Sequence, residues 1–109
     1  MKEIITYDDF SKLELRIGVV REAVRVEGSN KLLKLSVDIG GEERQILAGV
    51  GTAYTPEEMV GRQIVVITNL APRMMMGLES QGMLLAADGH DGPVILQPQK
   101  EVPQGASVK

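Results

Sequence analysis

Two segments of this 109-residue sequence alternate strictly between apolar and polar side chains, and this alternation constrains the fold more than any other feature. A period of two places successive side chains on opposite faces of a β-strand, so that one face can be buried. The apolar positions are Leu13, Leu15, Ile17 and Val19 in the first segment and Leu33, Leu35, Val37 and Ile39 in the second. The sequence therefore predicts two half-buried strands.

The first of these strands changes phase halfway along. After Val19 the apolar face is continued by Val20, Val24 and Val26, one residue out of step with the preceding pattern. A phase slip beside Gly18 indicates a bulge or a sharp bend. Long, bent first strands suit small closed barrels.

Three further strands are predicted downstream. Gly40 and Gly41 supply the positive φ angles of a tight hairpin turn, which leads to a strand over residues 44–48 that pairs antiparallel with the second. The segments 64–67 and 83–87 are apolar at every residue. Such runs are typical of strands covered on both faces.

Capping signals predict two short helices. Thr6 and Asp8 are both suited to cap a helical turn over residues 8–13. In the segment TPEEMVG at 55–61, the threonine caps, the proline takes the first helical position, the second glutamate completes a capping box and the glycine ends the turn. The second helix would bridge the third and fourth strands.

Five strands with one helix between the third and fourth match the OB-fold, an all-β, five-stranded Greek-key barrel. The length suits one domain, which we expect to extend over residues 1–109. The tail 88–109 is rich in Gly, Pro and Asp but has an apolar run at 94–96. We expect this C-terminal extension to add a short strand outside the barrel, with apolar surface suited to a second subunit.

Composition narrows the functional classes. The chain has no cysteine, so an ordinary packed core must hold it together, and it shows no signal peptide or membrane-spanning run, so we expect a cytoplasmic protein without a membrane partner. The formal net charge of −3 argues against non-specific binding to polyanions, so a nucleic-acid site must be a local basic patch. Aromatic residues make up only 3%, which argues against a groove that stacks successive unpaired bases on rings.

Residues suited to catalysis or metal binding are scarce. The single histidine, His90, lies in the turn-like stretch DGHDG, and a solvated loop position is its expected role. No cysteine or second histidine completes a metal site, and no spacing indicates a nucleophile with its base. We therefore expect no cofactor, no metal site, no catalytic residues and no enzymatic activity.

Basic and sulfur-containing residues are more informative. Arg16 and Lys34 fall on the polar faces of the first two strands, and Lys31, Arg44 and Arg73 lie in or near connections, so a barrel could bring them together. From composition alone an ordinary solvated face explains them better than RNA binding. The methionine run 74–76, with a further methionine at 83, fits core filling or a subunit contact better than a ligand site.

Several separated motifs resemble one family. The segments DDFSKLELRIG, VEGSNKLLKLSVDIG, NLAPRMMMGLESQGMLLAA and PQGASVK, in this order, are similar to the tRNA-binding domain family over essentially the whole chain. That family includes a domain of methionyl-tRNA synthetases, the free-standing beta chain of that enzyme and structure-specific tRNA-binding proteins. The resemblance implies a homodimer that binds the elbow of tRNA by shape and partners the catalytic subunit of methionyl-tRNA synthetase as its accessory or beta subunit.

The resemblance also implies which residues contact RNA. The residues carried over are Asn30, Lys31, Lys34, Arg44, Arg73, Ser80, Gln81 and Met83. Cations would hold phosphates, while hydroxyl and amide groups would bind sugars or base edges. Many relatives have a basic residue directly after the PR of this motif, where this chain has Met74, so one phosphate contact is missing and we expect weaker, more salt-sensitive binding.

Two other functions compete with this one. The family has a branch of dimeric, secretion-related chaperones that hold unfolded polypeptides, and the methionine cluster fits that branch loosely. An enzyme hosted on the same fold is a third alternative. The beginning at Met1 and the ending in SVK favour a free-standing protein over a domain cut from a synthetase.

Overall fold

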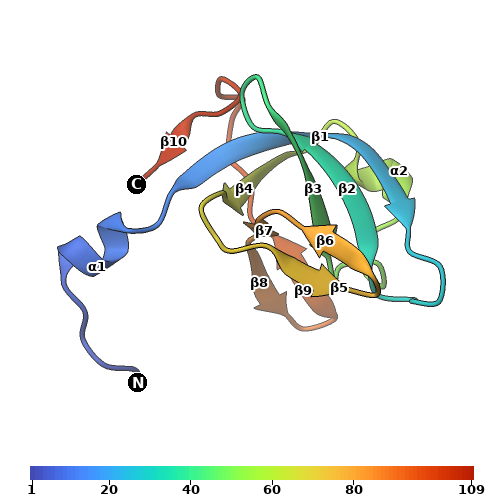
Figure 1. The fold of residues 1–109 in the computed structure, drawn as a ribbon, viewed down its shortest axis with the longest axis horizontal. Helices are drawn as coiled ribbons and strands as arrows, with labels where there is room; N and C mark the ends of the chain where they lie inside the picture. Colours follow the sequence, from blue (N-terminus) through green and yellow to red (C-terminus); the bar gives the residue numbers. More distant parts are fainter.

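The architecture is organised around one long strand, β1, which pairs with three other strands in the computed structural model of residues 1–109 (Figure 1). The main sheet has the order β3-β2-β1-β4-β7, with β10 added beside β1. The elements are α1 (Tyr7–Ser11), β1 (Leu15–Arg25), β2 (Leu33–Asp38), β3 (Glu43–Ala48), α2 (Pro56–Met59), β4 (Gln63–Ile67), β5 (Arg73–Met75), β6 (Leu78–Ser80), β7 (Met83–Leu84), β8 (Ala86–Gly89), β9 (Gly92–Ile95) and β10 (Ser107–Val108). The all-β, OB-like barrel predicted from the sequence is confirmed.

The bend of β1 comes from a bulge at Arg21. Val20 pairs with Val37, but the next pair is Glu22 with Ser36, so Arg21 is an extra residue. Before the bulge β1 pairs with β4 and β10, and from Val19 onward it pairs with β2. The predicted bulge is therefore confirmed.

Two apolar residues of this region do not face the core as predicted. The bulge turns Ala23 toward the core, so that Val24 points outward and is 49% exposed. Leu13 precedes the strand and is also exposed. Both predictions were wrong because hydrophobic alternation does not specify where a strand begins or how a bulge resets its faces.

Gly18 of β1 lies against side chains at the end of β2. A Cβ atom at this position would lie 2.5 Å from Cγ1 of Val37, well inside van der Waals contact. Only glycine therefore allows the two strands to approach this closely at the bend.

The core fills the inside of the barrel. The predicted inward residues of β2 are all buried, and Ile64 and Val66 of β4 are fully buried beside them. Met59, the last residue of α2, is fully buried and closes one end of the barrel. The hydrophobic core cluster contains Val20, Leu33, Leu35, Val37, Ile39, Ile46, Ala48, Val50, Met59, Ile64, Val66, Leu84 and Ile95.

The β2–β3 hairpin turns at two glycines, as predicted. Gly40 and Gly41 both have φ of 97°, which only glycine adopts without strain. Their backbone N–H groups donate to the carboxylate of Asp38 at 2.8 and 3.1 Å. These hydrogen bonds favour the ionised carboxylate and lower the pKa of Asp38.

Both predicted helices form with reciprocal caps. At α2 the side chain of Thr55 accepts from the backbone of Glu58 at 3.2 Å, and the Glu58 carboxylate accepts from the Thr55 backbone at 2.9 Å. The second of these bonds lowers the pKa of Glu58. At α1 the cap is Thr6, in a capping box with Asp9, rather than the alternative Asp8. Neither helix has the length and apolar character needed to cross a membrane.

The predicted strand over residues 83–87 is only partly correct. β7 ends after two residues, and Leu85 then donates to the carbonyl of Val65 at 3.0 Å while accepting from Leu96 at 3.1 Å. The chain leaves the barrel at this point and enters the separate β8–β9 hairpin. Met83 and both alanines of the run are exposed, so the strand is not covered on both faces.

The tail adds strands outside the barrel, as expected. β9 contains two residues of the predicted apolar run and pairs with β8, and its Ile95 enters the core at 6% exposure. β10 pairs with the start of β1, opposite the edge that β4 occupies.

The N-terminal arm, residues 1–13, projects away from the barrel (Figure 1). No residue of α1 is buried. Its exposed apolar side chains are Ile4, Ile5, Tyr7, Phe10 and Leu13.

Replacing Leu35 with alanine tests the assignment of the inward face of β2. Leu35 is 1% exposed, so its truncation should lower the free energy of unfolding by about 2–5 kcal/mol through lost burial and the cavity left behind. Its neighbour Ser36 faces outward, and Ser36→Ala should change stability by no more than about 0.5 kcal/mol. Urea denaturation followed by circular dichroism measures both, and equal effects would refute the assigned faces.

Candidate nucleic-acid interface

Seven of the eight residues expected to contact RNA line two adjacent depressions. Lys31, Arg73, Ser80 and Met83 line the first, and Lys34, Arg44 and Gln81 line the second. The two depressions adjoin at Ser80, which lines the first, and at the next residue, Gln81, which lines the second. Asn30 lines neither depression but is exposed directly before Lys31.

The first depression, called the groove below, has a volume of about 530 Å³ and a mainly apolar lining. Hydrophobic residues account for 11 of its 17 lining residues, and the only charged ones are Lys31 and Arg73. No carboxylate lines it. In a chain with a net charge of −3, the groove is a local group of cations without acids, which is the kind of patch that a nucleic-acid site would need here.

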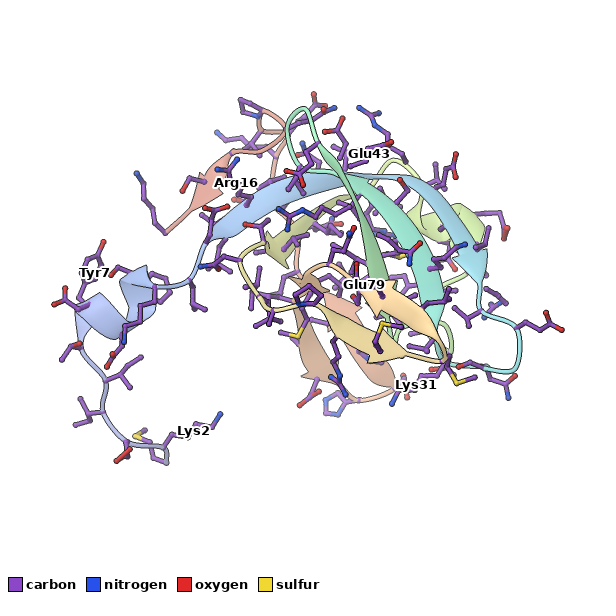
Figure 2. The ribbon with its side chains drawn as sticks, in the orientation of Figure 1. Lys2, Tyr7, Arg16, Lys31, Glu43 and Glu79 are labelled. Carbon is purple, nitrogen blue, oxygen red and sulfur yellow. The ribbon has the colours of Figure 1, made fainter.

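The backbone around Lys31 is held firmly. The Lys31 carbonyl accepts from the backbone of Gly51 at 2.7 Å, and its aliphatic stem lies against Gly49. A Cβ atom at Gly51 would lie 2.8 Å from the Lys31 carbonyl, so this contact needs glycine. The Lys31 ammonium itself makes no hydrogen bond or ion pair within the protein, and Figure 2 shows Lys31 on the side of the barrel where β5 and β6 lie. It is free to bind an anion.

Arg73 opens the β5–β6 hairpin, whose turn has positive φ at Met76 and Gly77. Its guanidinium is exposed and has no partner within the protein. Met75, two residues later, is on the same face of β5 and lines the groove, whereas Met74 alternates to the other face and is 64% exposed. A basic residue in place of Met74 would therefore not point into the groove.

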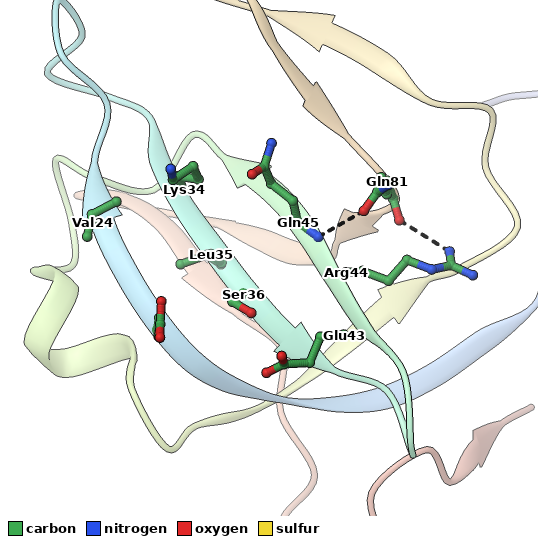
Figure 3. A pocket seen from close by; sticks show the side chains of 9 residues that line it. Val24, Lys34, Leu35, Ser36, Glu43, Arg44, Gln45 and Gln81 are labelled. Carbon is green, nitrogen blue, oxygen red and sulfur yellow. Dashed lines mark hydrogen bonds between the residues drawn. The ribbon is translucent and has the colours of Figure 1, made fainter.

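The second depression, the polar hollow, has mixed charge (Figure 3). Its volume is about 360 Å³, and its two cations, Lys34 and Arg44, are accompanied by the carboxylates of Glu22 and Glu43. Opposite charges in one hollow weaken its field toward a phosphate. The groove is therefore the stronger anion site of the two.

Arg44 is engaged inside the protein. Its Nη1 donates to the Gln81 carbonyl at 3.3 Å (Figure 3) and to the Thr68 carbonyl at 2.6 Å. Its Nε pairs with Glu42 at 2.8 Å. The Thr68 hydroxyl donates to Glu14 and is the main reason that the pKa of the Glu14 carboxyl lies below its ordinary value. Arg44 thus joins β3 to the end of β4 and to the β6–β7 connection.

Ser80 and Gln81 close the barrel against the free edge of β3. The Ser80 hydroxyl accepts from the Leu47 backbone and donates to the Gly82 carbonyl, both at 3.0 Å. The Gln81 backbone donates to the Gln45 carbonyl at 2.8 Å, and its side chain accepts from the Gln45 backbone at 3.1 Å. Ser80 is 3% exposed, so its hydroxyl supports the groove wall and is not offered to a ligand.

Several groove residues were not among the sequence-based candidates. Leu70, Ala86 and Pro93 contribute to the lining from connections and from the β8–β9 hairpin. The position of Gly49 and Gly51 directly after a strand is the one available sequence signal for the close backbone approach at Lys31. His90 lies exposed in the β8–β9 turn, and no group of three or more His, Cys, Asp or Glu side chains is placed to hold a metal ion.

Comparison with known proteins identifies the family. Residues 15–107 match the family described as "Putative tRNA binding domain". The chain belongs to this tRNA-binding domain family. The resemblance noted in the sequence is therefore confirmed.

These relatives are longer enzymes, and the chain matches only a part of each. Over 108 residues the chain is 55% identical to the methionine--tRNA ligase of Methanothrix thermoacetophila, covering 99% of this chain and 16% of that protein. Over 104 residues it is 54% identical to the Thermotoga maritima methionine--tRNA ligase, covering 95% of this chain and again 16% of the relative. The chain thus spans about a sixth of these ligases and is a tRNA-binding module related to one of their domains.

Solved structures share the fold over the full length. A MetRS-related protein from Pyrococcus horikoshii superposes with a TM-score of 0.92 at 38% identity, covering 99% of this chain and 100% of the other. The chaperone CsaA from Bacillus anthracis superposes with a TM-score of 0.89 at 30% identity, covering 98% and 100%.

Replacing Ser80 with alanine should weaken the closure of the barrel. The substitution leaves the buried Leu47 N–H without an acceptor, which should lower the free energy of unfolding by about 1–3 kcal/mol. Thermal unfolding of the variant, compared with Ser36→Ala, measures the effect. An unchanged midpoint would show that this hydrogen bond does not hold the β6–β7 connection in place.

Proposed function

We propose that this protein is a non-catalytic tRNA-binding module that serves as the accessory or beta subunit of methionyl-tRNA synthetase in the cytoplasm. The observation that carries the proposal is the groove, which has two unpaired cations and no acid in a chain of the tRNA-binding domain family. Methionine--tRNA ligases among the relatives support the choice of synthetase. No cofactor is needed for such a role.

The RNA contacts follow from the accessibility of each residue. Lys31 and Arg73 hold phosphates at the groove, with Met83 providing apolar contact beside them. Lys34 adds a further cation at the polar hollow, and Asn30 binds sugar or base edges. Gln81, whose amide already bonds Gln45 and Glu79, supports the wall of the hollow. Arg44 and Ser80 act indirectly, by fixing the strands that carry these groups.

The RNA feature bound is the elbow of tRNA, recognised by shape. A chain with three aromatic residues and few free cations is poorly equipped to hold an extended single strand. It is better suited to a rigid, folded RNA that brings several phosphates and hydroxyls to fixed positions. Tethered to the synthetase, such a module raises the effective concentration of tRNA at the catalytic subunit.

The active form is a homodimer in this proposal. The apolar side chains of the N-terminal arm stay exposed within one chain, and the arm lies on the same side of the barrel as β10 (Figure 1). A second copy that covers this surface would remove it from water.

Sedimentation equilibrium should give a dimer for the parent and a monomer for Ile5→Asp, whereas a monomeric parent would contradict the arrangement.

A chaperone role is the second candidate, favoured by the fold shared with CsaA and by the apolar lining of the groove. A chaperone would bind unfolded polypeptide at the surface assigned here to RNA. A binding assay in which reduced, denatured polypeptide and tRNA compete for this surface therefore separates the two roles.

The central test is the effect of Lys31→Ala and Arg73→Ala on tRNA affinity. Each variant should weaken binding several-fold to about tenfold for all tRNA species and reduce the slope of log K against log salt by about 0.7–0.9, because each removes one phosphate contact. Lys2→Ala, on the N-terminal arm far from the groove (Figure 2), is the matched control.

The assay is a filter-binding titration of tRNA at two salt concentrations, with single-stranded RNA and duplex DNA of similar length for comparison. Preferential binding of tRNA, lost in both variants, supports the proposal. Unchanged affinity in both variants would exclude the groove as the RNA site, and equal binding of all three nucleic acids would exclude recognition of tRNA shape.

A further inference from the structure

The groove presents two kinds of surface that a phosphate backbone alone cannot satisfy. Lys31 and Arg73 suit phosphates, but most of the surface around them is aliphatic or sulfur-containing, including Leu70, Met75 and Met83. A helical RNA that offered only phosphates and hydroxyls would leave this apolar surface in water. The occupant must therefore carry an anion next to an apolar face.

We propose that the groove accepts one exposed nucleobase of the folded RNA, with Lys31 and Arg73 holding the phosphates on either side. This inference rests on the proposed function and specifies what the groove takes from the tRNA. The volume of about 530 Å³ lies within the roughly 300–1,000 Å³ of small-ligand sites, so it has room for a planar base. Methionine sulfur packs favourably against aromatic rings, which compensates for the absence of aromatic side chains in the groove.

Charge selects a nucleotide over a peptide as the occupant. The groove carries two cations and no carboxylate, so it complements a group with phosphates on both sides of an apolar ring better than a polypeptide of mixed charge. The polar hollow next to it has two acids, so the RNA backbone is favoured on the groove side.

The same lining predicts that base identity is not read. Apart from the two cations, the only polar side chain in the groove is Ser80, whose hydroxyl already bonds Leu47 and Gly82. No free side-chain amide or hydroxyl group in the groove is left to distinguish one base edge from another. The groove therefore detects an exposed base and accepts any of the four.

The RNA side of the test uses the parent protein and tRNA transcripts in which each unpaired nucleotide of the elbow is made abasic in turn. One abasic position should lower affinity about tenfold, the order expected for a lost base contact, without changing the salt slope, because its phosphates remain. Replacing the same base with each of the other three should have little effect. Tight binding of tRNA that no abasic position weakens would overturn the base-binding inference and leave the proposed function intact, whereas failure to bind any tRNA would overturn both.

The protein side compares two adjacent alanines of β8. Both are exposed, but only Ala86 lines the groove, while Ala87 points to the other face of the strand. Ala86→Glu should lower tRNA affinity at least tenfold. In this variant the abasic position that weakens binding to the parent should have no further effect. Ala87→Glu adds the same charge and should behave like the parent. Circular dichroism establishes that both variants are folded.

A reduced, denatured polypeptide is the third probe. If Ala86→Glu abolishes binding of that polypeptide and leaves tRNA binding unchanged, the groove is a polypeptide site and the inference is overturned. Loss of tRNA binding in Ala86→Glu alone, together with a sensitive abasic position, supports it.

Discussion

The bulge that bends β1 is the feature on which the remaining structure depends. β1 pairs with β4 and β10 over its first residues and with β2 from Val19 onward, and its bend carries the sheet from one side of the core to the other. Gly18 permits the close approach of β2 at the bend, and the extra residue at Arg21 resets which side chains face inward. Once β1 is bent, β2 and β3 curve over the core and only the edge of β3 remains to be closed.

That closure creates the candidate site. The free edge of β3 is satisfied by Ser80 and Gln81 instead of by a regular neighbouring strand, and Arg44 ties the same connection to the end of β4. The β5–β6 hairpin is thereby held over the end of β3, where its Arg73 lies at the same groove as Lys31. The cations of the groove remain unpaired because the hydrogen bonds needed for closure come from other residues.

Much of the fold could be predicted from the sequence because the informative signals are local. The alternation in β2, the paired glycines of its turn and the capping box of α2 each specify backbone conformation within a few residues. The strand predicted over residues 83–87 was too long, because a continuous apolar run does not show whether its residues are buried by the core or left on the surface. Val24 was misplaced because the exact bulged residue depends on pairing with a distant strand.

The site was predictable only in part. Family resemblance supplied the candidate residues, but whether Lys31 and Arg73 share a groove depends on how the barrel closes, which no local pattern encodes. For the same reason, sequence could not separate Arg44 and Ser80, which are engaged internally, from the residues whose side chains are free.

The central claim is that the cationic groove is where tRNA binds, and the six methionines of the chain allow it to be observed directly. With methyl-labelled methionine, NMR titration with tRNA should shift the resonances of Met75 and Met83, which line the groove, and leave that of Met59, which is fully buried in the core, unchanged. Binding of tRNA that leaves Met75 and Met83 unshifted would contradict the account.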